Sequence, residues 1–459
     1  MKILIKGAGD LATGIASRLY GAGHQILMTE IREPLTVRRT VALSRAVYEG
    51  CAEVEEMKAY QVDSQEEAGE VLNRGDIPVM VDPGAECRNW YEPDVVVDAI
   101  LAKKNLGTKI TDAPFVIGVG PGFAAGSDCH CVVETKRGHT LGNVIWRGSA
   151  IPNTGVPGNV GGYTIERLIR ASADGLVEPK VRIGDFVEAG QVVALTGGKP
   201  VYAQMGGIVR GMLQEGAAVT ENLKIGDIDA RAELSHCYTI SDKARAIGGG
   251  VLEAVSRFGL MRGRYAIVIL AAGAGTRFGG DKLLAMVREK PIYEHMLDKV
   301  KAFSSFPAFI VTGDGQIAEA AEKRGVVSVQ NKEPEKGIAR SLCLGLEAAK
   351  KAFSYEGRED SLRGVLFSVC DQPGLETSTI QRIFNTAVLH PGSIVCAGRF
   401  GRTGNPVLWD RQYFSELEKL TGDVGGRRIM SEYRDRIRVV ETGAEELTDV
   451  DRREDLESL

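Results

Sequence analysis

The sequence predicts an α/β protein in which two open, mostly parallel sheets lie on either side of a small all-β region. Two long segments, one at each end of the 459 residues, alternate short apolar runs with helical periodicity and glycine-rich turns. This pattern is typical of parallel strands covered by helices. Between the two segments the helical periodicity disappears. A chain of this length exceeds one hydrophobic core, so several domains are expected.

We divide the sequence into four parts. The predicted boundaries are 1–170 for an N-terminal α/β domain, 171–232 for the β region, 233–262 for a connecting segment and 263–459 for a C-terminal α/β domain. The N-terminal strands are expected at KILIKG, HQILMTEI, IPVMVDP, PDVVVDAI and PFVIGVGPG, and the C-terminal strands at YAIVILAAG, PAFIVTG, VVSVQN, VLFSVCD, SIVCAG and RIRVVE. In the connecting segment, a helix is expected to follow Gly248-Gly249-Gly250.

Composition excludes several classes of protein. The net charge of −5 lacks the basic surplus of a general nucleic-acid binder. No apolar run approaches the roughly 20 residues that span a bilayer, and the N-terminus MKILIKGAGD does not resemble a signal peptide. Eight cysteines in so long a chain indicate reduced thiols. We therefore expect a cytoplasmic protein without nucleic-acid or membrane partners.

The β region contains an internal repeat. Gly175, Val177 and Val187 recur as Gly207, Val209 and Val219, each offset by 32 residues. Two copies of a short strand unit indicate pseudo-twofold symmetry, because neither copy can bury its apolar face alone. The region resembles a biotinyl/lipoyl-type barrel. It lacks that family's E-x-M-K-M hairpin, so whether Lys199 in the shorter TGGKP hairpin is modified stays open.

The strongest chemical signal is the string LAAGAGTRFGGDK, which directly follows the strand at Tyr265. Its glycines allow the backbone N–H groups to approach a polyanion. Arg277 and Lys282 supply positive charge for phosphate oxygens. The string is not a P-loop, because the G-K-[ST] ending is missing. It is not a dinucleotide fingerprint either, because no acidic residue ends a second strand about 20 positions on.

This string resembles the signature of MobA-like nucleotidyltransferases, and among them the molybdenum cofactor cytidylyltransferases. The resemblance covers nearly all of 265–459 and implies catalytic roles for Arg277, Lys282 and Asp371, with Mg²⁺ held by Asp371 and, as the candidate second ligand, Asp451. It implies that the nucleotide is bound by Leu270, Ala271, Ala272, Gly273, Gly275, Gly337 and Ser341. Asn405 stands where the family more often has histidine, so its role stays open.

The identity of the base rests on one position of the loop. Ala271-Ala272-Gly273 is similar to the cytidylyl-specific form, whereas guanylyl members more often carry Ala-Gly-Gly. The extra methyl at the second position narrows the slot for a purine, which favours CTP over GTP. The physical argument for the metal is independent, since Mg²⁺ takes few carboxylates together with phosphate oxygens. Asp371 ends the expected strand VLFSVCD, at the sheet edge where α/β folds bind ligands.

The N-terminal strand KILI leads into a second glycine-rich turn, KGAGDLATG. Gly7, Gly9 and Ala12 fit the G-x-G-x-x-A pattern, and Glu30 ends the next strand, 21 positions after Gly9. Spacing and context predict a Rossmann-like unit that binds a dinucleotide through these four residues. The alternative is a Rossmann-type fold without the cofactor.

Residues 1–258 resemble YqeB-type accessory proteins of selenium-dependent molybdenum hydroxylases, which are related to XdhC-type maturation factors. The matching blocks are IKGAGDLATG, GVGPGFAAGSD, VVETKRGHTLGNVIW, GSAIPNTGVPG and ISDKARAIGGGVLEA. Together the two resemblances imply a maturation protein that transfers CMP from CTP to a molybdopterin-type cofactor and serves an apo molybdenum hydroxylase. The alternatives are a nucleotidyltransferase for sugar or polyol phosphates and a chaperone or scaffold without turnover.

Overall fold

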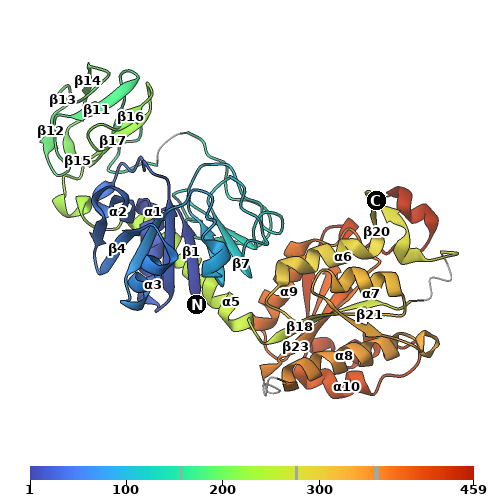
Figure 1. Cartoon of the computed structure of the whole chain (residues 1–459). Helices are drawn as coiled ribbons and strands as arrows, with labels where there is room; N and C mark the ends of the chain where they lie inside the picture. The colour runs from blue at the N-terminus through green and yellow to red at the C-terminus, as the bar shows by residue number, and fades with distance from the viewer. Residues whose placement is uncertain (156–157, 274–277, 356–360, 459) are drawn as a thin grey trace. The chain divides into compact units, whose positions relative to one another are not determined.

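A computed structural model of the chain describes residues 1–155, 158–273, 278–355 and 361–458. The chain divides into two compact units, Met1–Val255 and Ser256–Leu459, and each is described by itself. Each unit contains an open sheet covered by helices (Figure 1). The expected α/β fold class is therefore confirmed.

The first unit contains a nine-stranded sheet in the order β3-β4-β5-β2-β1-β6-β7-β8-β9. The strands are β1 (Lys2–Lys6), β2 (Gln25–Glu30), β3 (Cys51–Val54), β4 (Met57–Val62), β5 (Ile77–Val81), β6 (Val95–Asp98), β7 (Phe115–Val119), β8 (Cys131–Val133) and β9 (Val144–Ile145). The pairs β3–β4 and β8–β9 are antiparallel and the others are parallel. The sheet is therefore mixed. The β3–β4 hairpin, which the sequence did not predict, turns through Glu55 with φ 52°.

Helices connect the parallel strands of this sheet. They are α1 (Asp10–Gly21), the short α2 (Ala46–Glu49), α3 (Gln65–Asn73) and α4 (Arg88–Tyr91). Residues of α3 and α4 share one apolar core with Leu4 and Leu27 of the central strands. This arrangement places the start of α1, with its glycine-rich turn, at the carboxyl end of β1.

Helix α5 (Asp242–Met261) begins in the first unit and includes the glycine triplet. The prediction that the helix starts after the triplet is therefore wrong. The reason is close packing. A Cβ at Gly248 would lie 2.5 Å from the carbonyl oxygen of Gly14 in α1, and a Cβ at Gly250 would lie 2.1 Å from the carbonyl oxygen of Gly142. Only glycine permits these approaches, which overrides its poor helix propensity.

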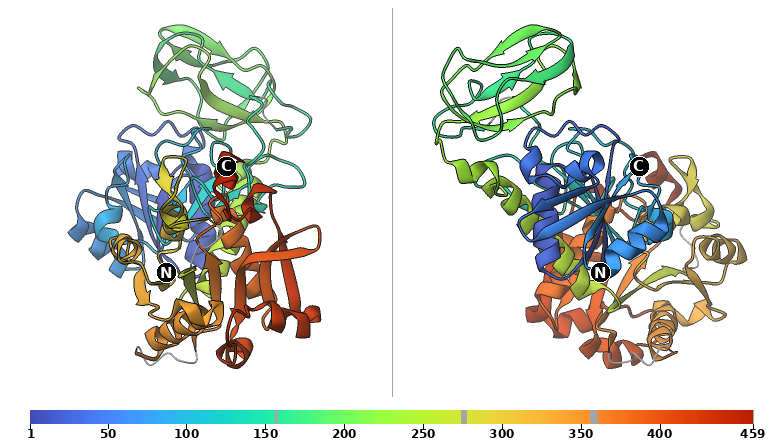
Figure 2. Two further views of the ribbon diagram at one scale, coloured as in Figure 1. Left: turned by 90° about the vertical axis from the view of Figure 1, so that its right-hand side faces the viewer. Right: turned by 60° about the vertical axis from the view of Figure 1, so that its left-hand side comes forward.

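The repeat region forms two four-stranded sheets that enclose one apolar core, and Figure 2 shows the two sheets facing each other. Its strands are β10 (Leu168–Arg170), β11 (Gly175–Pro179), β12 (Phe186–Val187), β13 (Val192–Thr196), β14 (Lys199–Tyr202), β15 (Gly207–Met212), β16 (Ala218–Val219) and β17 (Lys224–Asp229). Gly175 pairs with Val219, and the equivalent Gly207 pairs with Val187. Each copy thus pairs with the other, and the predicted symmetric β module is confirmed.

The second unit has a seven-stranded sheet in the order β22-β21-β18-β23-β25-β24-β26. The strands are β18 (Tyr265–Ala271), β21 (Ala308–Thr312), β22 (Val327–Gln330), β23 (Gly364–Val369), β24 (Ile394–Arg399), β25 (Arg402–Asp410) and β26 (Ile437–Glu441). The sequence predicted all of these except β25, which pairs antiparallel with both β23 and β24. A small hairpin, β19 (Met286–Val287) with β20 (Lys290–Pro291), lies outside this sheet.

Helices cover both faces of the second sheet (Figure 1). They are α6 (Ile292–Val300), α7 (Gly315–Glu322), α8 (Ile338–Tyr355), α9 (Thr377–Leu389), α10 (Phe414–Glu418) and α11 (Arg427–Glu432). Helix α8 shares a core with β18 and β23 that includes Val268, Leu346 and Val365. Gly345 in α8 allows this approach, because a Cβ there would meet Val268 at 2.3 Å.

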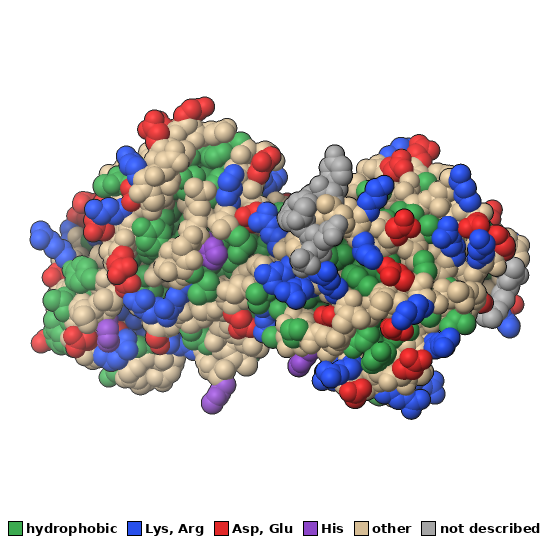
Figure 3. All heavy atoms as spheres, turned by 90° about the horizontal axis from the view of Figure 1, so that it is seen from below, with side chains coloured by type: hydrophobic (Ala, Val, Ile, Leu, Met, Phe, Trp, Pro, Cys, Tyr) green, Lys and Arg blue, Asp and Glu red, His purple; other side chains and the backbone are tan. Residues whose placement is uncertain are grey.

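The surface carries charges of both signs. Basic and acidic side chains occur side by side across the face shown in Figure 3, in line with the net charge of −5. In the part of the chain that the structure describes, no helix combines the length and apolar character that crossing a membrane requires.

The eight cysteines are all free thiols. Cys51 in β3 is exposed, whereas Cys129 and Cys396 are buried. Burial raises the pKa of the Cys129 and Cys396 thiols to about 12.

Candidate functional site

The candidate catalytic residues of the second unit lie at the carboxyl edge of its sheet. Strands β18 and β23 are parallel neighbours, with Leu270 beside Val369. The glycine-rich loop therefore leaves the sheet next to the segment that carries Asp371. Parallel strands end on the same edge of a sheet, which is where open α/β folds bind their ligands.

Lys282 joins the two aspartates that the sequence singled out. Its Nζ lies 2.6 Å from Oδ2 of Asp371 and 3.2 Å from Oδ1 of Asp451. The lysine side chain is 13% exposed, whereas that of Asp451 is 49% exposed. The structure thus brings together three predicted residues separated by up to 169 positions in the sequence.

Only one of the two carboxylate oxygens of Asp371 accepts a hydrogen bond from the described residues. Its Oδ2 accepts from Lys282, but its Oδ1 is buried and has no hydrogen-bond partner among the described residues. A buried carboxylate oxygen without a partner is costly, so such an atom calls for a cation or a donor. Among the described residues no three carboxylate, imidazole or thiol side chains form a ready-made metal site. Mg²⁺ does not require one, because it takes one or two carboxylates together with substrate phosphates.

The C-terminal segment is fixed against the loop that follows β23. The backbone N–H of Val450 donates to the carbonyl of Asp371 at 2.9 Å. The amide Nε2 of Gln372 donates to Oδ1 of Asp449 at 2.9 Å. A Cβ at Gly374 would lie 2.4 Å from the carbonyl oxygen of Glu445, so the two segments touch through their backbones. These contacts position the segment that carries Asp451 next to Asp371.

An apolar cluster ties the same segment to the end of the glycine-rich loop. Phe278, Val287, Ile292 and Val450 are buried together. The guanidinium of Arg453 lies over the Phe278 ring, 5.8 Å from its centroid. Because Phe278 and Lys282 are only four residues apart, burial of the ring helps to hold Lys282 near the carboxylates.

The electrostatics of the site follow from this crowding. Burial, and then the neighbouring charges of Asp371 and Asp451, raise the pKa of Asp449. Burial lowers the pKa of Lys282, but the hydrogen bonds and charges of Asp371 and Asp451 together outweigh burial, so the pKa is raised. Burial lowers the pKa of Lys299 to about 8. The ammonium of Lys299 donates to the carbonyls of His295 and Pro373, which holds the loop after Asp371 in place.

The predicted nucleotide-binding residues lie in two places. Leu270, Ala271, Ala272 and Gly273 form the end of β18 and the start of the loop beyond it. Gly275 and Arg277 lie outside the described residues. Their predicted roles in holding phosphate therefore stay predictions.

Gly337 and Ser341 lie at the start of α8. Gly337 has φ +80°, and a Cβ there would lie 2.5 Å from the backbone of Gly422. Oδ1 of Asp423 accepts from the backbone N–H of Ile338 at 3.5 Å, so Asp423 lies at the N-terminus of α8. The buried Ser341 hydroxyl accepts from Nδ2 of Asn331 at 3.0 Å. These bonds fix the turn between β22 and α8.

Sequence reasoning missed three contributors to the site. Asp449 adds a third carboxylate near Asp371 and Asp451. The D-x-D spacing signalled Asp449, but only Asp451 was chosen as a ligand. The roles of Gln372 and Lys299 depend on tertiary contacts that local sequence does not reveal. Asn405 lies in β25, and its role stays open.

The four residues predicted to bind a dinucleotide, Gly7, Gly9, Ala12 and Glu30, line one cavity of about 880 Å³ in the first unit. The carboxylate of Glu30 accepts from the backbone N–H groups of Ala8 and Ile31, both at 2.9 Å. Burial raises the pKa of Glu30. The glycine-rich turn and the acidic strand end thus line the same cavity, and their binding of a dinucleotide stays a prediction.

Comparisons with known proteins bear on both units. Residues 267–437 match the MobA-like NTP transferase domain. The chain is 51% identical over 253 residues to the uncharacterized protein YqeB of Escherichia coli (strain K12). The aligned region covers 55% of this chain and 47% of that protein. This chain is also 35% identical over 80 residues to a probable molybdenum cofactor guanylyltransferase of Thermococcus gammatolerans, covering 17% of this chain and 42% of that protein. The chain thus spans about half or less of the length of these relatives.

Solved structures give weak similarity. Rv0371c from Mycobacterium tuberculosis is 24% identical over 42% of this chain and 96% of its own length, with a TM-score of 0.36. Molybdopterin-guanine dinucleotide biosynthesis protein A from Archaeoglobus fulgidus is 16% identical over 42% of this chain and 95% of its own length, with a TM-score of 0.30. The family match and the identity to YqeB are the informative findings: this chain fuses a YqeB-like part to a C-terminal MobA-like NTP transferase domain.

Proposed function

We propose that the C-terminal domain transfers CMP from CTP to the phosphate of a molybdopterin-type cofactor and releases pyrophosphate. The observation that carries this proposal is the contact of Lys282 with Asp371 and Asp451 beside the glycine-rich loop. The loop lies within the segment that matches MobA-like NTP transferases. Similarity to a probable molybdenum cofactor guanylyltransferase supports the choice of acceptor.

In the proposed reaction an oxygen of the acceptor phosphate attacks the α-phosphorus of CTP. The new P–O bond forms in line with the bond to the β-phosphate, which breaks, and pyrophosphate leaves with its electron pair. Catalysis of this kind rests on positioning and on charge stabilisation. Lys282 is partly buried and keeps its proton, because its pKa is raised. It therefore supplies a fixed positive charge for the phosphate oxygens.

A divalent metal fits the residues of this site. Asp371 would hold Mg²⁺ through its buried Oδ1, which has no partner in the part of the chain that the structure describes, and Asp451 is the second candidate ligand. When bound, Mg²⁺ neutralises charge on the phosphates and on the leaving pyrophosphate. Lys282 contacts both carboxylates, and its positive charge offsets their mutual repulsion.

The proposal extends to the YqeB-like part, which would serve the maturation of an apo molybdenum hydroxylase. Its support is the 51% identity to YqeB and the fusion to a MobA-like domain in one chain. Fusion keeps the enzyme that makes a cofactor at high local concentration near the module that uses it.

The test is a pyrophosphate-release assay on the full chain with each of the four NTPs, with and without molybdopterin. Release is expected with CTP, Mg²⁺ and molybdopterin together, and chelation of the metal with EDTA should abolish it. Mass spectrometry should find the pterin joined to CMP. If pyrophosphate were released only with a sugar or polyol phosphate, the assignment of molybdopterin as the acceptor would be refuted. If the hydroxylase matured without any nucleotidyl transfer, the chain would instead act as a scaffold.

Replacement of Ala272 by glycine should shift the choice of base. Removal of one methyl widens the slot, and one methyl is worth about tenfold or more in discrimination. We expect A272G to raise kcat/KM for GTP relative to CTP by about tenfold. Gly273→Ala in the same loop is the converse control, since its Cβ would meet none of the described atoms within 4 Å. An unchanged GTP/CTP ratio in A272G would contradict the assignment of the base to this position.

A further inference from the structure

The cavity of the first unit has walls from two structural modules. The turn before α1 and the loop after β2 form one side, with Gly9, Glu30 and Arg38. The β module forms another, with Arg167, Arg210 and Lys224. The segment that follows β2 docks the module, because Nε of Arg39 donates to the carbonyl of Met212 and a Cβ at Gly211 would meet Val37 at 2.8 Å. The β module is thus part of this cavity.

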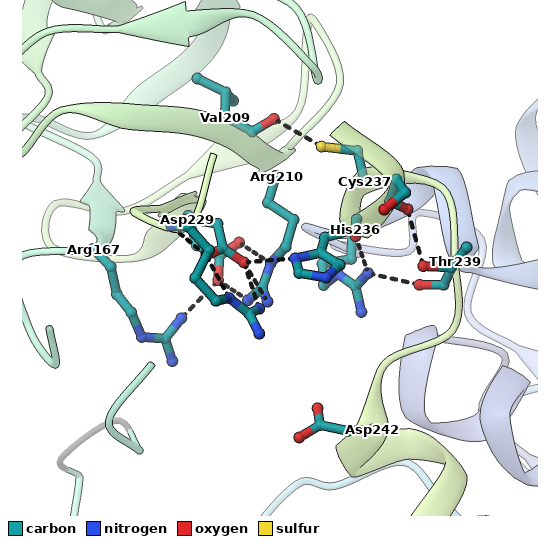
Figure 4. A network of polar contacts seen from close by, with 12 residues as sticks. Arg167, Val209, Arg210, Asp229, His236, Cys237, Thr239 and Asp242 are labelled. Carbon is teal, nitrogen blue, oxygen red and sulfur yellow. Dashed lines mark hydrogen bonds and ion pairs between the residues drawn. The ribbon is translucent and has the colours of Figure 1, made fainter. Parts of the chain in front are cut away.

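The lining of the cavity is strongly basic. Among the described residues it contains seven lysines and arginines against three carboxylates, those of Asp10, Glu30 and Asp227. Nη2 of Arg210 lies 2.6 Å and Nη1 of Arg167 lies 2.8 Å from Oδ2 of Asp227, and the more distant Lys224 approaches the same oxygen. Asp229 lies close to Asp227, and Figure 4 shows Arg167 and Arg210 reaching toward these acidic side chains. Asp227 thus faces three cations, one of which, Arg210, also pairs with Asp229.

The remaining positive charge is poorly compensated. No hydrogen bond or ion pair is found for the Lys243 ammonium within the described ranges. Burial, and then the nearby charge of Arg137, lower the pKa of Lys243. Arg137 itself pairs with Asp242 at 2.7 Å. An anion in the cavity would meet Lys243 directly.

Two buried guanidinium groups also have donors to spare. Arg38 is 7% and Arg167 is 9% exposed, and both line the cavity. The Nε–H group of each is buried and finds no acceptor among the residues that the structure describes. A buried charged donor without an acceptor is costly, and native proteins keep few of them. Such donors indicate that an acceptor-rich ligand belongs here.

The N-terminus of α1 opens into the same space. This helix has 12 residues, and its N-cap residue Gly9 provides no side-chain hydrogen bond. Gly9, Asp10, Leu11 and Ala12 all line the cavity. An uncapped helix N-terminus with a glycine-rich turn favours a phosphate group, because the N–H groups and the helix dipole both point at it.

We propose that this cavity binds an organic pyrophosphate, with one phosphate on the α1 N-terminus and the other facing Lys243 and the arginines of the β module. The volume of about 880 Å³ suits a nucleoside diphosphate or a pyrophosphate-linked dinucleotide. Two sources share this chemistry. One is a redox dinucleotide, and the other is the dinucleotide that the second unit would make, which rests on the proposed function above.

Three probes distinguish these sources in the full chain: inorganic pyrophosphate, CDP and NAD⁺. Calorimetric titrations are run in EDTA, which removes the metal that the second unit would need. Hydrogen–deuterium exchange then locates the bound probe. Protection is expected in peptides that cover 7–14 and not in peptides that cover 265–273. Stronger binding of NAD⁺ than of CDP indicates a redox dinucleotide, and the reverse order indicates a cytidine ligand.

Two variants test the assigned contacts. Lys243→Met removes a charge for which the described residues provide no partner, and affinity for pyrophosphate should fall about tenfold. Gly9→Val fills the cavity beside the helix N-terminus without backbone strain, because Gly9 has φ −67° and its Cβ would meet only Thr36 at 3.8 Å. It should abolish the protection of 7–14. The matched control is Lys58→Met, which removes an exposed charge in β4.

Pyrophosphate release by the second unit should be unchanged in Gly9→Val and Lys243→Met. A failure of the binding site proposed here can therefore be told apart from a failure of the proposed transferase activity. The inference is overturned if none of the three probes binds in a saturable manner. It is also overturned if binding survives in both variants or if protection falls only on the second unit.

Discussion

Asp371→Asn should lower kcat for pyrophosphate release on the order of 10³-fold. The amide keeps the size of the side chain but removes the negative charge. The atom at the position of Oδ1, which has no partner among the residues described, would then no longer attract a divalent metal. The loss should not be rescued by raising Mg²⁺ within the range that the parent protein requires. Initial rates with CTP and molybdopterin measure it directly.

Two comparisons make this result specific. Asp435→Asn removes an exposed carboxylate of the same unit that pairs with its neighbour Arg436, and it should leave the rate unchanged. Lys282→Met should also lower the rate, and it should in addition weaken the hold on Asp451. Thermal unfolding of each variant checks that the fold survives. A rate for Asp371→Asn within threefold of the parent would refute the assigned role.

Gly250→Ala should destabilise the first unit by about 3 kcal/mol, although alanine is the better helix former. The added Cβ would lie 2.1 Å from the carbonyl oxygen of Gly142 and 3.0 Å from Val133, so the backbone must move. Urea-dependent hydrogen exchange of peptides from β1 and α1 measures the change in the free energy of unfolding. This readout reports on the first unit alone.

The neighbouring glycine provides the matched control. Gly249 lies in the same helix but is exposed, and a Cβ there would meet nothing within 4 Å. Gly249→Ala should therefore stabilise the unit by about 1 kcal/mol through helix propensity. If both substitutions changed stability in the same direction, the close approach to Gly142 would not be what demands glycine at 250.

At these glycines the fold could not be predicted from local sequence. Local propensity places a break at Gly248-Gly249-Gly250, but α5 runs through them because two of the three face other backbones. The strand β25 was missed because it begins with RTGN, which has no apolar alternation. Apolar runs such as YAIVILA, by contrast, predicted β18 because burial on both faces of a parallel sheet requires them.

The site was predictable to the extent that its chemistry is local. The glycine-rich loop and the strand-end Asp371 can be recognised from neighbouring residues, and the structure places Lys282 against that carboxylate. Asp449 and Lys299 could not be assigned in this way. Their contacts join segments about 70 residues or more apart, and only the folded sheet brings those segments together.

The distribution of thiols determines where the protein can be chemically labelled. The thiolate, not the thiol, reacts with electrophiles. Buried thiols such as Cys129 and Cys396 stay protonated near neutral pH, because their pKa values are raised to about 12. Cys51 is exposed on an edge strand of the first sheet. A maleimide dye would therefore attach there first, and the natural sequence already offers a handle for fluorescence on the first unit.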